Sequence, residues 1–367
     1  MDKCQKDIAS VEFVNIKDLP DCEKIIDDIW TQSKQGWIWN TVQMFEFRKS
    51  CLPKGKETKD LSFVIYKEGK PIGFFFLLAF KSQTYFEATF SAAPLYWPCF
   101  IDRYADDLKI NKETFAYIDM LCMDNNIGSL KVMLSDGESK SKIYHSILQE
   151  HNYIDESYDS HIVKPKEFSI RDVRPKNRQM IRKYADKFVV KILLESDITE
   201  DTIHQYNKLH VLDSGGNFRD LNTYYKQFEL FQKGGFVVCA FAKENNNISV
   251  GMLHVLVSKN EAYETSVAVN PEYHKFYVSH ILKFHAIQYM QSEQVEVYEL
   301  GQSFYCSTLS HIPSKKNYGI NYFKDGWSGG KTRRVHNAIK FYQAEALNDF
   351  CILKARELEN TCYFSNN

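Results

Sequence analysis

Two stretches of the chain, residues 63–90 and 237–269, alternate short apolar runs with tight polar turns. In the first, the apolar runs FVIY and IGFFFLLAF are separated by KEGKP and followed by KSQ and TYFEATF. In the second, VVCAFA, ISVGMLHVLVS and EAYETSVAV are separated by KENNN and KN. Apolar, β-branched and aromatic runs bounded by Gly, Asn and Lys are typical of strands joined by tight turns. Each stretch therefore predicts a meander of three strands.

The two meanders resemble each other in sequence, which indicates an internal repeat. Gly73 aligns with Gly251 and Tyr85 aligns with Tyr263, and both pairs lie 178 positions apart without a gap. One match of this kind arises easily by chance, whereas two within matching meanders favour a duplication. The chain is therefore predicted to contain one structural unit twice.

A helix and a further strand are predicted after each meander. Residues 114–124 (TFAYIDMLCMD) and 278–290 (VSHILKFHAIQYM) carry apolar residues at helical spacing. The short apolar segments SLKVMLS and VEVYELG follow these helices. Three antiparallel strands, a helix and another strand form an α+β unit in which the helix covers one face of the sheet.

A basic, proline-containing stretch at 164–187 separates the two copies and leads into a helix. We place the domain boundary near Arg174, which predicts an N-terminal domain at 1–173 and a C-terminal domain at 174–367. The segment 337–360 is amphipathic and is predicted as a packing helix at the end of the C-terminal domain.

Composition indicates a globular protein without strong global charge. The chain has 367 residues, 44% of them hydrophobic and 25% charged, with a net charge of −1. This balance provides no field that attracts DNA or an anionic membrane. The nine cysteines show no metal-ligand spacing, and the longest apolar run, Ile72–Phe80, is too short to span a bilayer. We expect a cytoplasmic protein without an integral membrane segment or a metal site.

Four further segments of the chain are distinctive: KNRQMIRKYADKFVV, NFRDLNTYYKQF, VEVYELGQ and NYGINYFKDGWSGG. They resemble segments of the FemAB-like branch of the GNAT acyltransferases, in which the meander unit occurs in tandem. They resemble, in order, an Arg-rich helix, an Arg-then-Tyr-Tyr segment, a Tyr-x-Leu-Gly strand end and a Phe-Lys-then-aromatic-Gly-Gly signature. Their order and spacing carry the resemblance. It implies an α+β fold of two tandem GNAT-like domains, each a mostly antiparallel β-meander covered by helices.

The resemblance also implies an N-acyltransferase that moves an acyl group to an amine on a sugar, nucleotide-sugar or cell-envelope precursor. Members of the family use acyl-CoA or aminoacyl-tRNA as a co-substrate, with no tightly bound cofactor. The chain has no room for the helical hairpin of the peptidoglycan-bridge members, and PEYHKFYVSH shows no glycine-rich pyrophosphate loop. We expect acyl-CoA as the donor, with aminoacyl-tRNA as the alternative.

Three residues are candidates for catalysis. By resemblance, Lys324 lies in the site and stabilises negative charge on the reacting carbonyl or on a phosphate; the alternative is an exposed lysine beside a turn. Glu264, on a strand of the second meander, is a candidate general base. Tyr298 precedes Gly301 at a strand end, where sheets of this kind open to ligands. His254 is read as a strand histidine satisfied by its neighbours.

The residues predicted to bind substrate come from several segments. By resemblance, Arg219, Tyr224 and Tyr225 face the phosphates or sugar of the acceptor, because Arg suits phosphate and Tyr suits ring stacking. The alternative is a helix whose tyrosines pack on the sheet. Gln302 at the strand end, Tyr322 beside Lys324, and Trp39 in the first domain complete the set: Arg219, Tyr224, Tyr225, Gln302, Tyr322 and Trp39. Core packing is the alternative for Trp39.

The segment after Lys324 is a candidate phosphate-binding turn. Gly329 and Gly330 are followed by Lys331 and Arg333, a combination of flexible backbone and positive charge. A solvated loop is the alternative, and the GxxxxGK[ST] pattern of a P-loop is absent.

Two functional hypotheses of different classes remain. The first is the N-acyltransferase, with a groove between the domains lined by Arg219, Tyr225, Tyr298, Gln302 and Lys324. The second is a non-catalytic binding protein of glycan assembly, since a fold alone does not establish catalysis. No HExxH or GxSxG motif supports a hydrolase or metalloenzyme.

Overall fold

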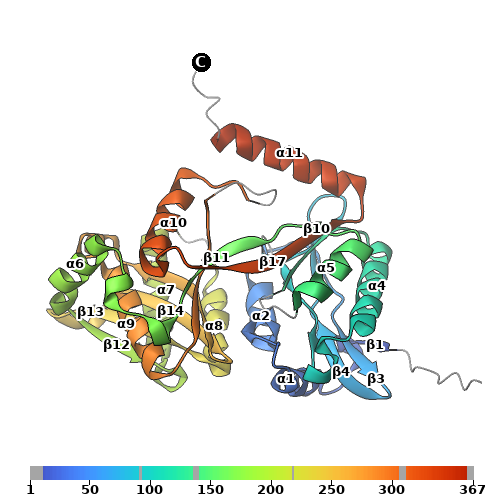
Figure 1. The fold of residues 1–367 in the computed structure, drawn as a ribbon, viewed down its shortest axis with the longest axis horizontal. Helices are drawn as coiled ribbons and strands as arrows, with labels where there is room; N and C mark the ends of the chain where they lie inside the picture. Colours follow the sequence, from blue (N-terminus) through green and yellow to red (C-terminus); the bar gives the residue numbers. More distant parts are fainter. Residues whose placement is uncertain (1–10, 91–92, 135–139, 217–218, 306–310, 362–367) are drawn as a thin grey trace, which may run out of the picture. The chain divides into compact units, whose positions relative to one another are not determined.

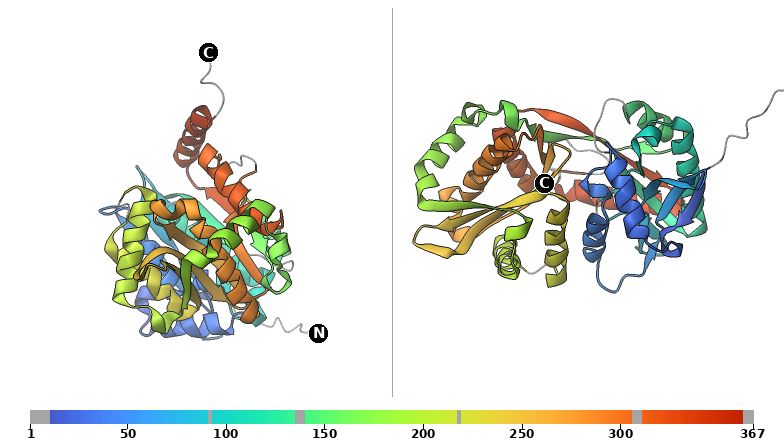
Figure 2. Two further views of the ribbon diagram at one scale, coloured as in Figure 1. Left: turned by 90° about the vertical axis from the view of Figure 1, so that its left-hand side faces the viewer. Right: turned by 90° about the horizontal axis from the view of Figure 1, so that it is seen from below.

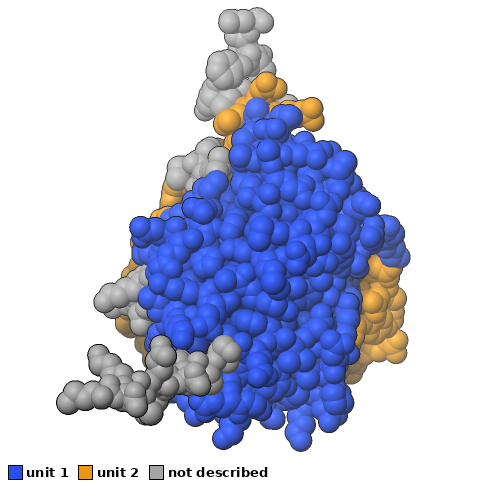
Figure 3. All heavy atoms as spheres, turned by 90° about the vertical axis from the view of Figure 1, so that its right-hand side faces the viewer, with its two compact units in different colours: residues 1–157, 335–355 blue, residues 158–334, 356–367 orange. Residues whose placement is uncertain are grey.

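The computed structural model describes residues 11–90, 93–134, 140–216, 219–305 and 311–361. The chain forms two compact units, residues 1–157 with 335–355 and residues 158–334 with 356–367 (Figure 3). No described helix is both long enough and apolar enough to cross a membrane. The domain boundary near Arg174 stays a prediction.

The first unit contains two sheets. One has the strand order β1-β3-β4-β8, and the other includes β17-β9-β6-β5-β2, with β7 also paired to β9 and β10 to β17. The strands are β1 (Glu12–Asn15), β2 (Thr58–Asp60), β3 (Phe63–Lys67), β4 (Lys70–Phe75), β5 (Leu78–Lys81), β6 (Phe86–Ala88), β7 (Leu95–Tyr96), β8 (Cys99–Phe100), β9 (Ile127–Leu134), β10 (Ile154–Asp155) and β17 (Thr332–Phe341). The helices are α1 (Cys22–Gln32), α2 (Val42–Ser50), α3 (Asp102–Ala105), α4 (Leu108–Asp124), α5 (Lys140–Glu150) and α11 (Ala344–Thr361), of which the residues from 356 on belong to the second unit.

The second unit is built on one sheet of order β12-β13-β14-β15-β16-β11, in which only the β15–β16 pair is parallel (Figure 1). Its strands are β11 (Tyr158–Val163), β12 (Phe188–Leu193), β13 (Gly235–Ala242), β14 (Asn245–Ser258), β15 (Glu261–Val269) and β16 (Val297–Gln302). Its helices are α6 (Pro175–Tyr184), α7 (Glu200–Ser214), α8 (Leu221–Glu229), α9 (Val278–Ser292) and α10 (Lys315–Ser328).

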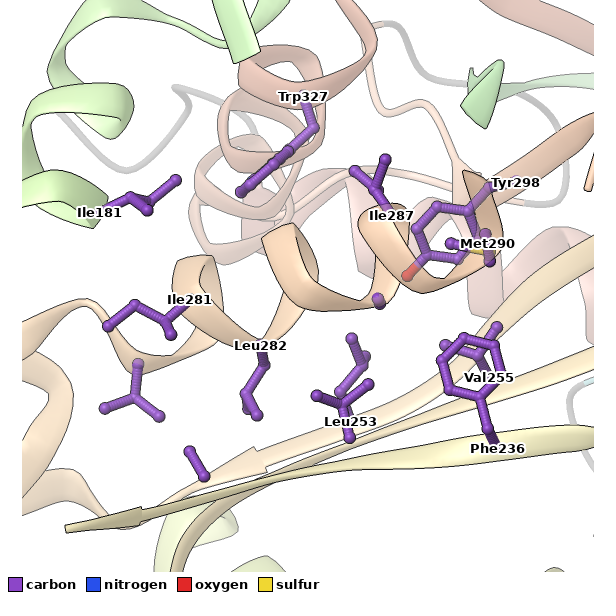
Figure 4. Packing of buried hydrophobic residues seen from close by; sticks show 14 of the residues in the cluster. Ile181, Phe236, Leu253, Val255, Ile281, Leu282, Ile287, Met290, Tyr298 and Trp327 are labelled. Atoms are coloured by element: carbon purple, nitrogen blue, oxygen red, sulfur yellow. The ribbon is translucent and has the colours of Figure 1, made fainter. Parts of the chain in front are cut away.

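Helices cover both faces of the second sheet (Figure 2). On one face α9 buries Ile281, Leu282, Ile287 and Met290 against Leu253 and other apolar strand residues (Figure 4). On the other face His254 lies between the rings of Tyr206 from α7 and Phe228 from α8, with ring centroids 4.0 and 4.8 Å away. Successive residues of β14 therefore enter two different layers, as strand alternation requires.

The repeat is confirmed at the glycine pair and wrong at the tyrosine pair. Gly73 and Gly251 both directly follow the extra residue of a bulge in the first hairpin of their unit, and a Cβ at either would lie under 3.0 Å from a neighbour. The second hairpins differ in turn length, with residues 82–85 in one copy and 259–260 in the other. Consequently Tyr85 precedes β6, whereas Tyr263 lies inside β15.

Several predicted elements need correction. The first meander has four strands, because the apolar run after residue 70 divides into β4 and β5, which belong to different sheets. The amphipathic segment predicted as a helix from Asn337 begins instead as β17, which pairs with β9. The helix starts at Ala344, after a turn. The other predicted helices and the strands that follow them are confirmed as α4 with β9 and α9 with β16.

Candidate functional site

The parallel pair β15–β16 opens into a fork. The two strands pair at only three positions, Glu261↔Val297, Ala262↔Tyr298 and Tyr263↔Glu299. Beyond them β15 continues to pair with β14, and β16 continues to pair with β11. The first residue of β15 past the paired stretch is Glu264. We call this opening, between Glu264 on β15 and Leu300–Gln302 on β16, the fork.

A bulge in β15 decides which side chains face the fork's helix layer. Val255 pairs with Glu264 and His254 pairs with Ser266, so that Thr265 is an extra residue in β15. An inserted residue reverses the alternation of side chains that follows it. Glu264 therefore faces the α9 layer with Val255, whereas Ser266 bonds to Tyr206 of α7 on the other face.

Glu264 is held by two buried groups. Its Oε2 accepts a hydrogen bond from Lys283 Nζ of α9 at 2.6 Å and another from the Tyr298 hydroxyl. The side chain of Lys283 is 2% exposed and that of Glu264 is 11% exposed. Burial lowers the pKa of Lys283, an effect that Glu264 opposes. Burial also raises the pKa of Tyr298 well above its ordinary value, with Glu264 adding to the rise, so this hydroxyl keeps its proton.

Lys324 reaches the same opening from α10. Its Nζ donates to the carbonyl of Gln302 at 3.2 Å and lies 5.4 Å from the centroid of the Phe304 ring. Burial lowers the pKa of this ammonium to about 8, opposed by Glu264 and assisted by the positive charge of Lys283. The described residues thus give Lys324 a single hydrogen-bond acceptor, which leaves its other N–H groups for a ligand.

Gly301 makes the approach of Lys324 feasible. It has a φ of +88°, and a Cβ there would lie 3.1 Å from Lys324 Nζ. Gly301→Ala is therefore expected to lower the free energy of unfolding by about 1–3 kcal/mol through backbone strain and to push the ammonium out of place. Chemical denaturation measures the first effect. Gly319→Ala is the matched control, because Gly319 lies in α10 with no atom within 4 Å of its added Cβ. Equal stability changes in the two variants would contradict the conclusion that the position of Gly301 requires a glycine.

Arg219 and Tyr224 lie with the helices of the opposite face. Arg219 donates to Gln227 Oε1 at 3.2 Å, and Gln227 bonds in turn to His254 Nδ1 at 3.0 Å. Tyr224 is fully buried and bonds to His210 at 3.0 Å. That one groove is lined by Arg219, Tyr225, Tyr298, Gln302 and Lys324 stays a prediction. Within the second unit the structure brings together the last three.

The remaining predicted substrate residues are scattered. Tyr225 donates to Glu200 at 2.8 Å and borders an open pocket beside Ile198. Tyr322 is 63% exposed, and its ring stacks on the guanidinium of Arg174 at 3.6 Å. In the first unit, Trp39 is 7% exposed and stacks on Tyr96 with centroids 5.3 Å apart, as expected for core packing.

The Gly-Gly segment ends a helix, a local role that competes with the predicted phosphate-binding turn. The amide of Gly329 donates to Asp325 O at 3.0 Å, and the amide of Lys331 donates to Ser328 O at 3.2 Å. The amide of Gly330 donates to Ser328 Oγ at 3.2 Å. All three amides are thus used by the cap of α10, and the negative end of a helix dipole repels anions.

Arg333 is also engaged elsewhere. Its guanidinium bonds to Glu299 at 3.1 Å and to Glu261 at 2.9 Å. Those carboxylates occupy the donors that a phosphate would need, so we leave Arg333 out of the candidate site. Lys331 is exposed and borders an open pocket with Lys164 and Trp327.

Sequence reasoning missed Lys283 and His161. A signal for Lys283 existed, because it shares a helix face with the buried Ile287 and Met290, where a lysine is out of place without a partner. His161, on β11, bonds to residues of α10, and no local pattern indicates that pairing. Within the described part of the chain, no group of His, Cys, Asp and Glu side chains is arranged to hold a metal ion.

The corresponding position in the first unit is closed. There β9 pairs in parallel first with β6 and then with β7, through Leu95↔Val132 and Tyr96↔Met133. In the first unit Ala88 of β6 pairs with β5, just as Ala262 of β15 pairs with β14 in the second unit. Ala88 is therefore the counterpart of Ala262. Two residues further on, Phe90 is the counterpart of Glu264. Phe90 is 3% exposed. The fork with its charged cluster is thus a feature of the second unit.

Neither a protein-family model nor a curated protein matches the sequence significantly. Solved structures nevertheless match nearly the whole chain. FemX matches with a TM-score of 0.65 at 10% identity, over 93% of this chain and 99% of FemX. L-PGS from Bacillus licheniformis matches with a TM-score of 0.56 at 9% identity, over 92% and 95% of the two chains. A tandem GNAT protein from the clavulanic acid biosynthesis pathway gives 0.50 at 9% identity, over 90% and 98%. This chain therefore has the FemAB-like tandem GNAT fold.

Proposed function

We propose that the protein is an N-acyltransferase and that transfer takes place at the fork of the second unit. The observation that carries the proposal is the convergence of Glu264, Tyr298 and Lys324 where β15 and β16 part. A carboxylate and an ammonium at one opening match what the transfer of an acyl group to an amine requires. The fold is one in which such chemistry occurs, but the fold alone is no argument for it.

In the proposed reaction the amine nitrogen attacks the carbonyl carbon of the ester or thioester, and its proton passes to Glu264. Lys283 and Tyr298 both bind Oε2 of this carboxylate, which leaves Oε1 for the incoming amine. The oxyanion that forms on the carbonyl oxygen is stabilised by Lys324. When the intermediate collapses, the new amide bond remains, the bond to the leaving group breaks, and the leaving group takes up the proton that Glu264 had accepted.

The donor proposed is acyl-CoA, with aminoacyl-tRNA as the other outcome of the test. The segment before α9 does not provide a glycine-rich phosphate loop. It forms a short 3₁₀ helix, Pro271–Phe276, in which the amides of Tyr273 and Tyr277 bond to nearby carbonyls. A polyphosphate donor would therefore depend on basic side chains near this segment, such as the exposed Lys275 and Lys183. The proposed acceptor is an amine on a sugar, nucleotide-sugar or glycan precursor.

The proposal is tested by incubating the protein with acetyl-CoA, longer acyl-CoA thioesters or aminoacyl-tRNA, together with amino sugars or nucleotide-linked amino sugars. We expect an N-acylated product by mass spectrometry with one donor class. That donor should stabilise the protein by about 2.7 kcal/mol at 100 times its Kd.

A Glu264→Gln/Lys324→Ala double variant is the matched control for this assay and should give no product. Binding of an acceptor without product from any donor would favour a non-catalytic glycan-binding protein. Product formation at the wild-type rate by the double variant would place the reaction elsewhere.

A further inference from the structure

His161 is a fully buried histidine that joins three segments around the fork. It lies on β11, where it pairs with Gly301 of β16. Its Nε2 lies 2.9 Å from Asn321 Oδ1, and its Nδ1 lies 3.0 Å from Ser328 Oγ. Asn321 and Ser328 are both on α10, on either side of Lys324 in the sequence. The imidazole therefore spans about two turns of the helix that carries Lys324.

The hydrogen bonds of this group have a defined direction. Asn321 Oδ1 also accepts from the amide of Phe304 at 2.8 Å, so it acts as the acceptor for His161 Nε2–H. His161 Nδ1 then carries no proton and accepts from the Ser328 hydroxyl, which itself accepts from the amide of Gly330. Burial lowers the pKa of His161, which preserves this neutral form. One tautomer of His161 thus satisfies the hydrogen bonds of this whole group.

The hydrogen bonds around His161 position both partners of the contact between the Lys324 ammonium and the Gln302 carbonyl. The ammonium bonds to the carbonyl of Gln302, and the next residues of that segment are tied through the Phe304 amide to Asn321. The helix that supplies the ammonium is tied to the sheet through His161. A change at His161 would release α10 from β11, and only the Phe304–Asn321 bond of this network would still join α10 to the segment 302–304. His161 itself makes no contact with Lys324 among the described hydrogen bonds.

We propose that His161 is a positioning residue, which holds Lys324 at the fork by locking α10 and the segment 302–304 to β11 through Asn321 and Ser328. Its catalytic consequence rests on the function proposed above, whereas the placement of the ammonium does not. Lys324 interacts electrostatically with Glu264. Lys283 reaches Glu264 from α9 and takes no part in the described hydrogen bonds of His161. Lys283 therefore provides an internal comparison.

The test reads the titration of individual amines and needs no substrate. Trace acetic anhydride is allowed to compete for the lysines between pH 6 and 11, and labelling at Lys324, Lys283 and the exposed Lys316 of α10 is followed by mass spectrometry. The wild-type protein should show Lys324 titrating near its lowered pKa of about 8. In His161→Leu the pKa of Lys324 should rise by at least one unit and its labelling at pH 7 should change, while Lys316 stays the same.

A second variant separates positioning from simple loss of folding. His161→Gln keeps a donor that can reach Asn321, and we expect it to retain most of the lowered pKa of Lys324. If His161→Leu does not fold, Ser328→Ala, which removes one of the two contacts, should give a smaller shift in the same direction. An unchanged Lys324 titration in any folded variant that lacks these bonds overturns the proposal. A shifted titration with an active Lys324→Ala protein would refute the proposed function and leave the positioning intact.

Discussion

Lys324→Ala should lower the rate of acyl transfer by about 10²–10³-fold, because it removes a preorganised positive charge from the developing oxyanion. The fold should survive, since the described contacts of this ammonium are one hydrogen bond to Gln302 and the approach to Phe304. One such hydrogen bond contributes only about 1 kcal/mol to stability. The measurement is the rate of N-acylated product formation, with thermal unfolding of the same sample as the check on folding.

The pH dependence of the wild-type rate provides a second test of the role of Lys324. The pKa of Lys324 is lowered to about 8 by burial. The charged form is the protonated one, so its contribution is present below pH 8 and is lost as the pH rises through that value. The loss at high pH should be absent from Lys324→Ala and present in Lys316→Ala, which changes an exposed lysine of the same helix. Equal rates for wild type and Lys324→Ala would refute the role.

Glu264→Gln is expected to abolish transfer and also to destabilise the second unit by about 3–5 kcal/mol. Glutamine cannot accept the amine proton, which accounts for the loss of activity. The stability loss has a separate cause, since the ammonium of Lys283 is 2% exposed and would remain buried without its counter-charge. Denaturant unfolding measures this loss. The same substitution at Glu261, on the same strand, is the control: this carboxylate is 37% exposed and shares Arg333 with Glu299, so its removal should cost about 1 kcal/mol or less.

A double variant distinguishes the two consequences of losing Glu264. Lys283→Met replaces the buried ammonium by an apolar side chain of similar length, and buried ion pairs can often be replaced in this way at little cost. Glu264→Gln/Lys283→Met should therefore regain most of the stability that Glu264→Gln loses, and should remain inactive. Recovery of activity in the double variant would show that the carboxylate only neutralises Lys283. Failure to regain stability would contradict the assignment of the cost to an unpaired charge.

Much of the fold follows from local pattern. Helical spacing at 278–290 and the alternating runs of the second meander correctly predicted α9 and the strands around it, because each element must bury one face. Gly73 and Gly251 marked equivalent bulges, since a side chain at either would collide with its neighbours. The pattern failed at Asn337, where a strand precedes α11, because amphipathic residues near a sheet edge satisfy either structure.

The candidate site depended on contacts between distant segments, which no local pattern in the sequence shows. The sequence by itself determined the repeat, the α+β architecture and the candidates Glu264, Tyr298 and Lys324. Only the tertiary structure decided that Glu264 faces α9 while an extra residue at Thr265 turns Ser266 to the other face, that Lys283 is the partner of Glu264, and that the glycines after Lys324 cap a helix. The reason is physical: alternation within a strand is read locally, whereas a bulge, a buried ion pair and a helix cap depend on what distant segments bring to the same place.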